Sequence, residues 1–353
     1  MAIPTTTIGS YPKPAYVRVP NWFEARRASD SQTWNPTEAY ERFLQEGSPS
    51  NAALLDQATQ EIVLEQVDAG IDIPTDGEIR REHYIYYQCR NFSGFDFAHL
   101  TKKAMRGGSW VADVPTIAGP IRSRAPILVR DWQIAQNATG RPVKMTLPGP
   151  LTIIDSTANA YYDDEGRLVR DLGDALNVEV RALGEAGCRW IQIDEPVFAR
   201  QPDRALSLGI DGLARCFYGL GTATRRAVHI CCGYPSDLDL VDYPKADRRS
   251  YAILADALET APIDAVSIED AHRHNDLALL ERFRRKTIIF GLVNIASTRI
   301  EPVEQIRDRL VQACRHIDRD RLIAAPDCGL IMLSRTLAVA KLHNLAAAAR
   351  SVD

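Results

Sequence analysis

The feature that most constrains the fold is an alternation, repeated along the whole chain, of short apolar runs with longer segments of helical periodicity. The helical segments include Leu172 to Ala186 and Pro302 to Ile317, whose apolar residues recur at helical spacing. The runs rich in β-branched and aliphatic residues are predicted strands, and they span Thr5 to Ile8, Ile71 to Thr75, Val114 to Ala118, Pro142 to Leu147, Trp190 to Asp194, Ala227 to Cys231, Ala265 to Ile268, Thr287 to Leu292 and Leu322 to Ala325. Repeated β–α units of this kind predict a parallel sheet covered by helices.

A closed barrel fits this alternation better than an open sheet. About eight or nine predicted strands are spread over the chain, and no glycine-rich dinucleotide-binding motif follows the first of them. We therefore predict an α/β fold of the (β/α)8 TIM barrel type, formed as one domain over residues 1–353, because such barrels reach this length with insertions. Asn21 to Ser50, rich in charge and proline, is expected to be an N-terminal helical excursion, and Ser93 to Trp110 and Tyr161 to Arg170 are expected to be loop insertions.

The composition indicates chemistry on small molecules. A formal net charge of -4 gives no electrostatic footprint for nucleic acid or for an anionic membrane surface. The chain has no run of about 18 apolar residues, so no membrane-spanning helix is expected. The seven cysteines lack the spacing of a disulfide framework, and the first residues do not resemble a secretion signal, so we expect a cytoplasmic enzyme.

Polar residues follow most of the predicted strands. In a TIM barrel the loops after the strands build the active site, so chemistry is expected at these positions. Any one of these residues has an alternative role as a helix cap or a turn residue, but all of them together indicate an active site. They are Ser10, Asp76, Glu78, Asp194, Glu195, His229, Cys231, Glu269, Asn294 and Cys328.

A histidine, two cysteines and a glutamate at three of these strand ends are candidate metal ligands. In an extended strand, residues i and i+2 point to the same side, so His229 and Cys231 can reach one metal ion together, whereas Cys232 points to the opposite side. Cys328 and Glu269 each follow another predicted strand. The alternative for the cysteines is that they are small buried hydrophobic residues, as free cysteines often are.

Seven short motifs along the chain resemble a known family. They are Pro4 to Ser10, Asp76 to Glu78, Leu147 to Pro150, Ile191 to Pro196, His229 to Cys231, Ser267 to Glu269 and Pro326 to Gly329. In this order they resemble the C-terminal catalytic half of cobalamin-independent methionine synthase, a zinc enzyme that methylates homocysteine. The spacing between His229 and Glu269 is longer here than in the family. The resemblance covers nearly the whole chain, and the family's N-terminal half has no counterpart in it. We therefore expect a stand-alone core enzyme with methyltransferase activity.

The resemblance implies that His229, Cys231, Glu269 and Cys328 bind zinc. A free thiol, with a pKa of about 8.5, is mostly protonated at neutral pH, and coordination to zinc turns it into the nucleophilic thiolate. Two thiolates and a carboxylate around the dication make the centre electron-rich, which keeps a bound substrate thiolate reactive.

The resemblance also implies how homocysteine is bound. By position in the family motifs, Glu78 and Asp194 make charge-assisted hydrogen bonds to the ammonium group and form the catalytic site with the metal. The backbone around Ile8, Gly9 and Ser10 receives the carboxylate of the amino acid.

Two departures from the family concern the methyl donor. Ala296 stands where the family has a histidine that protonates the leaving folate nitrogen, and Ser156 stands where it has a tryptophan that stacks on the pteridine. These departures predict a donor other than free methyltetrahydrofolate, such as a methylated corrinoid, or a replacement acid. His272 and His274 are the candidates for that acid, with the alternative that they are solvated loop histidines.

Two other functions stay open at the level of sequence. One is the zinc-dependent addition of a thiol such as coenzyme M to an epoxide, because Arg80, Arg81 and Arg200 would suit a sulfonate. The other is a structural role for zinc in a scaffold protein, since zinc sites with four protein ligands are usually structural. A partner protein that carries the methyl group is compatible with the leading hypothesis, and the oligomeric state is not predicted.

Overall fold

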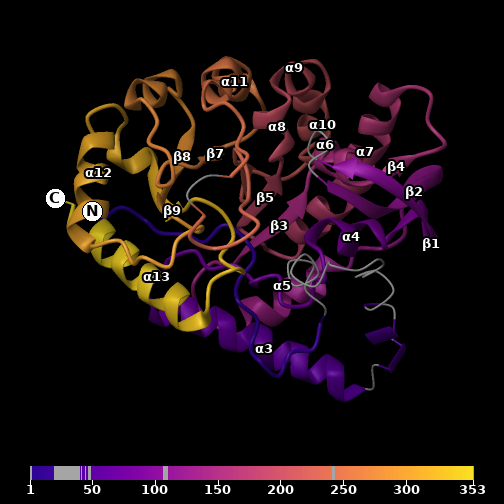
Figure 1. The fold of residues 1–353 in the computed structure, drawn as a ribbon, viewed down its shortest axis with the longest axis horizontal. Coiled ribbons are helices and arrows are strands. Elements are labelled where there is room, and N and C mark those ends of the chain that lie inside the picture. The colour runs from indigo at the N-terminus through magenta and orange to yellow at the C-terminus, as the bar shows by residue number, and fades with distance from the viewer. Residues whose placement is uncertain are drawn as a thin grey trace.

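The computed structural model describes residues 2–19, 40, 42–43, 45–46, 49–105, 110–240 and 243–352. Figure 1 shows helices arranged around the outside of a central group of strands. In chain order the elements are α3 (Pro49–Asp68), α4 (Tyr84–Cys89), β1 (Phe92–Met105), β2 (Trp110–Ser123), α5 (Leu128–Gln136), β3 (Lys144–Pro148), α6 (Pro150–Ser156), β4 (Ala158–Asn159), α7 (Glu165–Glu185), β5 (Trp190–Asp194), α8 (Val197–Arg200), α9 (Pro202–Arg204), the π-helix η2 (Ala205–Gly209), α10 (Ile210–Cys216), β6 (Arg225–Ile230), α11 (Arg249–Thr260), β7 (Ala265–Ile268), the 3-10 helix η3 (Leu277–Arg282), β8 (Thr287–Val293), α12 (Val303–Ala313), the 3-10 helix η4 (Arg319–Arg321), β9 (Leu322–Pro326) and α13 (Arg335–Arg350).

A parallel sheet closes into a barrel. Six strands are hydrogen-bonded in the order β3-β5-β6-β7-β8-β9, and each neighbouring pair is parallel. Two short segments near the N-terminus complete the ring between β9 and β3, through the parallel bridges Thr5–Ala324, Thr6–Ile73 and Thr75–Lys144. The predicted α/β TIM barrel is therefore confirmed.

Outside the barrel, one predicted strand lies in a separate sheet, and two segments expected to be loops were predicted wrongly. Val114 to Ala118 is a strand, but it belongs to β2, which pairs antiparallel with β1 outside the barrel sheet. Ser93 to Trp110 was expected to be a loop, yet most of it is the long strand β1, because β2 supplies its hydrogen-bonding partners. Tyr161 to Arg170 contains the start of α7, where the Asp164 carboxylate accepts a hydrogen bond from the N–H of Gly166.

The expected N-terminal excursion lies mostly outside the described residues. Those residues of it that the structure describes, at positions 40, 42–43, 45–46 and 49–50, are helical. Among the described helices, none has both the length and the apolar character needed to span a bilayer.

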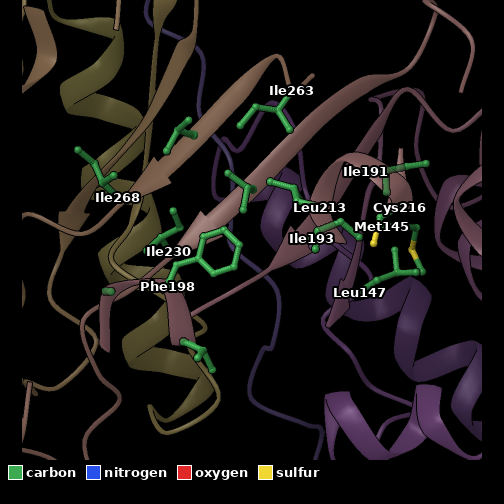
Figure 2. Close-up of a cluster of buried hydrophobic side chains, with 14 of the residues drawn as sticks. Met145, Leu147, Ile191, Ile193, Phe198, Leu213, Cys216, Ile230, Ile263 and Ile268 are labelled. Atoms are coloured by element: carbon green, nitrogen blue, oxygen red, sulfur yellow. The ribbon is translucent and has the colours of Figure 1, made fainter. Parts of the chain in front are cut away.

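The main hydrophobic core lies between the barrel and its helices. Along β5, Ile191 and Ile193 belong to this core, and on either side β3 and β6 contribute Met145 and Ile230. Figure 2 shows these side chains close to Phe198 of α8 and to residues of α10. Each fully buried aliphatic side chain of this kind contributes about 1.5–3 kcal/mol to folding.

The barrel interior has a second, smaller apolar cluster. Its members are small or branched, as the narrow centre of a barrel requires, and they are Ile8, Ile73, Ala227, Ala265, Ile289, Ile323 and Ala325. Because side chains alternate along a strand, the residues two positions farther along β6 and β7 share the inward side, and these are His229 and Ser267. Along β6 and β7 the interior thus changes from apolar to polar toward the carboxyl ends of the strands.

Candidate metal and substrate site

Three metal donors meet at the carboxyl-terminal end of the barrel. His229 lies in β6, Cys231 follows this strand, and Cys328 follows β9. Their ligand atoms all lie within 4.8 Å of one another, with Sγ of Cys328 3.4 Å from Nε2 of His229 and 3.9 Å from Sγ of Cys231. His229 and Cys231 are buried, and Cys328 is partly exposed.

Hydrogen bonds orient the donors. Nδ1 of His229 is 2.8 Å from Oγ of Ser267 in β7, which leaves Nε2 facing the sulfur of Cys328. Burial lowers the pKa of His229, but the contact with Cys231 and the charge of Asp194 outweigh burial and raise this pKa overall. The thiol of Cys328 donates to Cys231, which lowers the pKa of Cys231 and raises that of Cys328. The arrangement therefore favours a thiolate within the cluster.

Glu269, the fourth predicted ligand, is not part of this group of mutually close donor atoms in the described chain. Its Oε1 accepts a hydrogen bond from Nζ of Lys245 at 2.6 Å, and its Oε2 accepts one from the N–H of Cys232 at 3.0 Å. Burial raises the pKa of Glu269, and the ammonium group of Lys245 opposes that rise. The role of Glu269 as a ligand stays a prediction.

Two buried carboxylates lie beside the donors. Asp194 ends β5 and is the register partner of His229 in β6. Nε2 of Gln192 donates to Oδ1 of Asp194 at 2.7 Å, and Oγ1 of Thr146 donates to Oε1 of Glu78 at 2.9 Å. Burial raises the pKa of Asp194 to about 6 and that of Glu78 to about 7. A bound cation would hold both groups in the charged form, which suits recognition of an ammonium group.

The predicted carboxylate-binding segment, Ile8 to Ser10, contacts the residues that hold these carboxylates. The carbonyl oxygen of Ile8 accepts a hydrogen bond at 2.8 Å from the same Gln192 amide that binds Asp194. A Cβ atom at Gly9 would lie 2.7 Å from Oε1 of Glu78, so only glycine allows this approach. Shared contacts therefore hold the segment and the two carboxylates together.

A buried network and two tyrosines near the site were not predicted from the sequence. Lys144, inside the barrel on β3, donates to Oε1 of Gln192 at 2.6 Å, and burial lowers the pKa of Lys144 to about 7. A lysine within an apolar strand was a usable signal for this network. The hydroxyl of Tyr234 donates to the carbonyl of Gly329, next to Cys328, at 2.8 Å. Burial, together with the nearby charges of Cys231 and Cys328, raises the pKa of both Tyr84 and Tyr234. Nothing in the sequence distinguishes these two tyrosines from the others.

The two candidate acids lie in different surroundings. Nδ1 of His272 is 3.4 Å from Nδ2 of Asn294, and its ring centroid is 4.7 Å from that of Tyr243. His274 has a side chain that is 58% exposed, and its Nδ1 is 3.0 Å from the carboxylate of Asp270. His272 is thus the less solvated candidate, and the catalytic role of either histidine stays a prediction.

The positions that depart from the family are ordered. Ala296 is buried, and its N–H donates to Oδ1 of Asn294 at 2.8 Å. Ser156 ends α6, and its carbonyl accepts a hydrogen bond from the hydroxyl of Tyr86 at 3.0 Å. The ring of Tyr86 in turn stacks on His83 with a centroid separation of 4.1 Å. Aromatic side chains from α4 and its N-cap therefore stand beside Ser156.

The three arginines that would suit a sulfonate substrate are all paired with carboxylates. Arg81 is bound to Asp76 at 3.2 Å and also donates to Thr146, and Arg200 is bound to Asp155 at 2.8 Å. Arg80 is paired with Asp56 and Asp131. These ion pairs give no support to a coenzyme M site.

The chemistry of the donor set fits zinc. Imidazole nitrogen and thiolate sulfur are preferred zinc ligands in proteins, and the hydroxyl of Ser267 fixes the ring of His229 as an outer-shell partner usually does. Three protein donors are also the number found in catalytic zinc sites, which keep a fourth position for water or substrate.

Comparisons with known proteins agree with this geometry. The family model described as the catalytic domain of cobalamin-independent synthase matches residues 3–351. The methionine synthase of Pyrococcus furiosus is 27% identical over 352 residues, which cover 99% of this chain and 93% of that protein. The methionine synthase of Saccharolobus solfataricus is 27% identical over 347 residues, covering 97% and 92% of the two chains.

Solved structures extend the likeness to three dimensions. A putative vitamin-B12-independent methionine synthase from Listeria monocytogenes, 19% identical, shares the fold with a TM-score of 0.71 over 99% of this chain and 98% of that one. A B12-independent methionine synthase from a Shewanella species, in complex with selenomethionine, is 30% identical with a TM-score of 0.85 over 99% of this chain and 97% of that one. The barrel, the site at its carboxyl-terminal end and these matches together show that the chain is a methyltransferase of the cobalamin-independent methionine synthase family.

Proposed function

We propose that this chain is a single-domain, zinc-dependent enzyme that transfers a methyl group to the thiol of homocysteine and so forms methionine. The observation that carries the proposal is the placement of three zinc-type donors, His229, Cys231 and Cys328, next to the carboxylates of Glu78 and Asp194. A thiol-binding group beside an ammonium-binding group matches the two functional ends of homocysteine. The selenomethionine bound by the Shewanella relative supports a product of the methionine type.

Each residue of the site would have its own role in the reaction. Zinc held by His229, Cys231 and Cys328 would keep the substrate sulfur in the thiolate form at neutral pH. The hydroxyl of Ser267 holds the imidazole in the orientation that this requires. The lone pair on the substrate sulfur forms the new bond to the methyl carbon as the bond to the donor breaks, and the electron pair of that bond leaves with the donor.

The substrate amino acid would be oriented by charge and by the backbone. Glu78 and Asp194 bind its ammonium group, and the segment Ile8 to Ser10 receives its carboxylate. The amide of Gln192 joins the two parts, because it donates both to Asp194 and to the carbonyl of Ile8. The thiol would thereby be placed next to the metal donors.

The donor we propose is one whose leaving group needs no proton, such as a methylated corrinoid, free or carried by a partner protein. When methyltetrahydrofolate gives up its methyl group, tetrahydrofolate is a poor leaving group unless its nitrogen is protonated, and general acid assistance is typically worth about 10² to 10⁴ in rate. Ala296 has no proton to give, and Ser156 has no ring to stack on a pteridine.

The experiment is to incubate zinc-loaded protein with homocysteine and each candidate donor and to detect methionine by mass spectrometry. We expect about one zinc per chain, faster turnover with methylcobalamin than with methyltetrahydrofolate, and loss of both zinc and product in Cys328→Ser and His229→Ala. Full zinc occupancy in both variants would refute the ligand assignment.

Two other outcomes of this experiment would change the proposal. Robust folate-dependent turnover would refute the proposed donor, and its loss in His272→Ala or His274→Ala would identify a replacement acid. Alkylation of coenzyme M in preference to homocysteine would refute the proposed thiol.

A further inference from the structure

The buried ion pair between Lys245 and Glu269 lies beside the metal donors and has no role in the reaction proposed above. Lys245 comes from the segment between β6 and α11, and Glu269 follows β7 directly. Nζ of Lys245 is 2.6 Å from Oε1 of Glu269, and the two side chains are only 4% and 3% exposed. The other carboxylate oxygen accepts the N–H of Cys232, the residue after the donor Cys231. Both oxygens of Glu269 are therefore engaged.

The backbone around Glu269 is fixed as well as its side chain. Its N–H donates to the hydroxyl of Tyr251 at 3.2 Å, and its carbonyl accepts from Nδ2 of Asn275 at 2.7 Å. The next three backbone N–H groups donate to the carboxylate of Asp327, which precedes Cys328, at 2.8 to 2.9 Å. These bonds fix the backbone, so a shift of the carboxylate toward the donors has to come from rotation of the side chain, which breaks its bonds to Lys245 and Cys232.

Lys245 would lose its main partner if Glu269 turned away from it. Its Nζ also lies 5.0 Å from the ring centroid of Tyr243, and the N–H of Ala246 donates to the carbonyl of Cys232 at 2.7 Å, which fixes the backbone next to the lysine. An ammonium group left in this buried position without a carboxylate is strongly disfavoured. The ion pair therefore holds the carboxylate in place.

We propose that Lys245 sets the number of protein ligands at the metal centre. By keeping Glu269 in the ion pair, it leaves His229, Cys231 and Cys328 as the protein donors and the fourth position to the substrate thiol. This inference rests on the proposed function, since it assumes that the cluster binds zinc.

The charge of the centre supports a set of three donors. Two thiolates and a neutral imidazole around a Zn²⁺ ion give a centre with no net charge. A carboxylate ligand would make the centre negative before the substrate arrives. A negative centre repels an incoming thiolate, and this repulsion is strong in a buried site. With Glu269 neutralised by Lys245, the centre becomes negative only when the substrate sulfur binds.

A double-mutant cycle on the full chain tests the proposal. The zinc Kd is measured, by competition with a chromophoric chelator, for the wild type, Lys245→Met, Glu269→Gln and the double variant. We expect the wild type and Glu269→Gln to agree within about threefold. Lys245→Met releases the carboxylate, and the added ligand should tighten zinc binding by on the order of 10- to 100-fold. The double variant should return to the wild-type value.

Two further variants serve as controls. Lys245→Arg retains a cation for Glu269 and should bind zinc as the wild type does. Lys286→Met removes another buried lysine, whose Nζ donates to the carbonyls of Ala261 and Ile263 before β7, and it should leave the zinc Kd unchanged. Circular dichroism of each variant shows whether it is folded.

A cobalt-substituted sample gives a second readout that does not depend on turnover. Homocysteine should change the cobalt absorption spectrum of the wild type at a lower concentration than that of Lys245→Met, where the carboxylate must first be displaced. A loss of zinc affinity of tenfold or more in Glu269→Gln alone would overturn the proposal, because Glu269 would then be a ligand in the wild type. Failure of the proposed function has a different signature, namely zinc binding that does not depend on Cys328, and a wild type that binds no metal would overturn both.

Discussion

At the scale of single residues, the immediate surroundings of Asp194 and Glu78 favour selection of an amino-acid substrate. Both carboxylates are buried, and each accepts a hydrogen bond from a side chain inside the barrel. The neutral donors Gln192 and Thr146 hold the carboxylates in position without adding charge, while the guanidinium of Arg81, 3.6 Å from Oε1 of Glu78, offsets part of the charge of Glu78. An ammonium group entering the site would therefore meet two oriented charges at low cost in reorganisation.

Replacing one of these charges should affect only thiols that carry an amine. In Asp194→Asn the carboxamide keeps the size of the side chain but loses the charge, so homocysteine should bind more weakly by about 1.5–3 kcal/mol. The measurement is a titration of cobalt-substituted protein with homocysteine and, as a control, with 4-mercaptobutanoate, which lacks only the amine. An equal loss of affinity for both thiols would contradict the assignment of Asp194 to the ammonium group.

The same carboxylates predict a dependence on pH. Burial raises the pKa of Glu78 to about 7 and that of Asp194 to about 6, so protons occupy them in the free enzyme as the pH falls through this range. Binding of an ammonium group needs the charged forms, so the affinity for homocysteine relative to 4-mercaptobutanoate should increase from pH 5.5 to about 7.5 and then level off. In Glu78→Gln the upper part of this increase should disappear. A ratio that stays constant over the range would argue against both carboxylates.

At the scale of elements, the carboxylate of Glu195, in the loop after β5, caps the N-terminus of helix α6, which follows β3. Oε1 of Glu195 accepts the N–H of Leu151, and Oε2 accepts both the N–H and the hydroxyl of Thr152, so the N-terminus of α6 is held by the residue after Asp194. A Cβ atom at Gly149, the N-cap, would lie 2.2 Å from Oε1 of Glu195, so glycine is required there. This contact ties α6 to the substrate-binding end of β5.

Removal of this cap should destabilise the protein. Glu195→Ala leaves buried helix N–H groups without an acceptor, and we expect a loss of about 1–3 kcal/mol in the free energy of unfolding, measured with urea. Glu185→Ala is the matched control, because Glu185 is 72% exposed in its ion pair with Arg181 and such pairs contribute about 0–1 kcal/mol. Equal midpoints for the two variants would show that the cap contributes no more than a surface ion pair.

At the scale of the whole molecule, the hydrophobic packing that stabilises the barrel is separate from the metal donors. The main core lies between strands and helices, and the smaller core fills the barrel centre. The donors sit at the ends of β6 and β9, beyond the apolar layer inside the barrel. The fold should therefore not depend on the metal.

Removal of the metal tests this separation. After treatment with a strong chelator, we expect the far-ultraviolet circular dichroism at 25 °C to be unchanged while methyl transfer is lost. The free energy of unfolding should fall only by the stabilisation that metal binding adds, which is about 2.7 kcal/mol when the metal is at 100 times its Kd. The Tm should decrease accordingly. Unfolding of the metal-free chain would show that the metal is structural.

Much of the barrel follows from local pattern. The predicted strands Trp190 to Asp194 and Ala265 to Ile268 have the same bounds as β5 and β7, because aliphatic and β-branched residues dominate strands that are buried on both sides. The three donors His229, Cys231 and Cys328 were also predictable, since strand ends in a barrel converge.

The barrel class, the strand ends that form the site and the three donors that meet there follow from the sequence alone, because each depends on the periodicity of a segment or on a rule common to all such barrels. That Ser93 to Trp110 is mostly a strand depends on the tertiary structure, because its hydrogen-bonding partner is another segment. The same holds for Glu269, whose strand-end position is visible in the sequence but whose partner Lys245 is not. A side chain's burial and its charged neighbours arise from contacts between distant segments, and no periodicity within one segment records them.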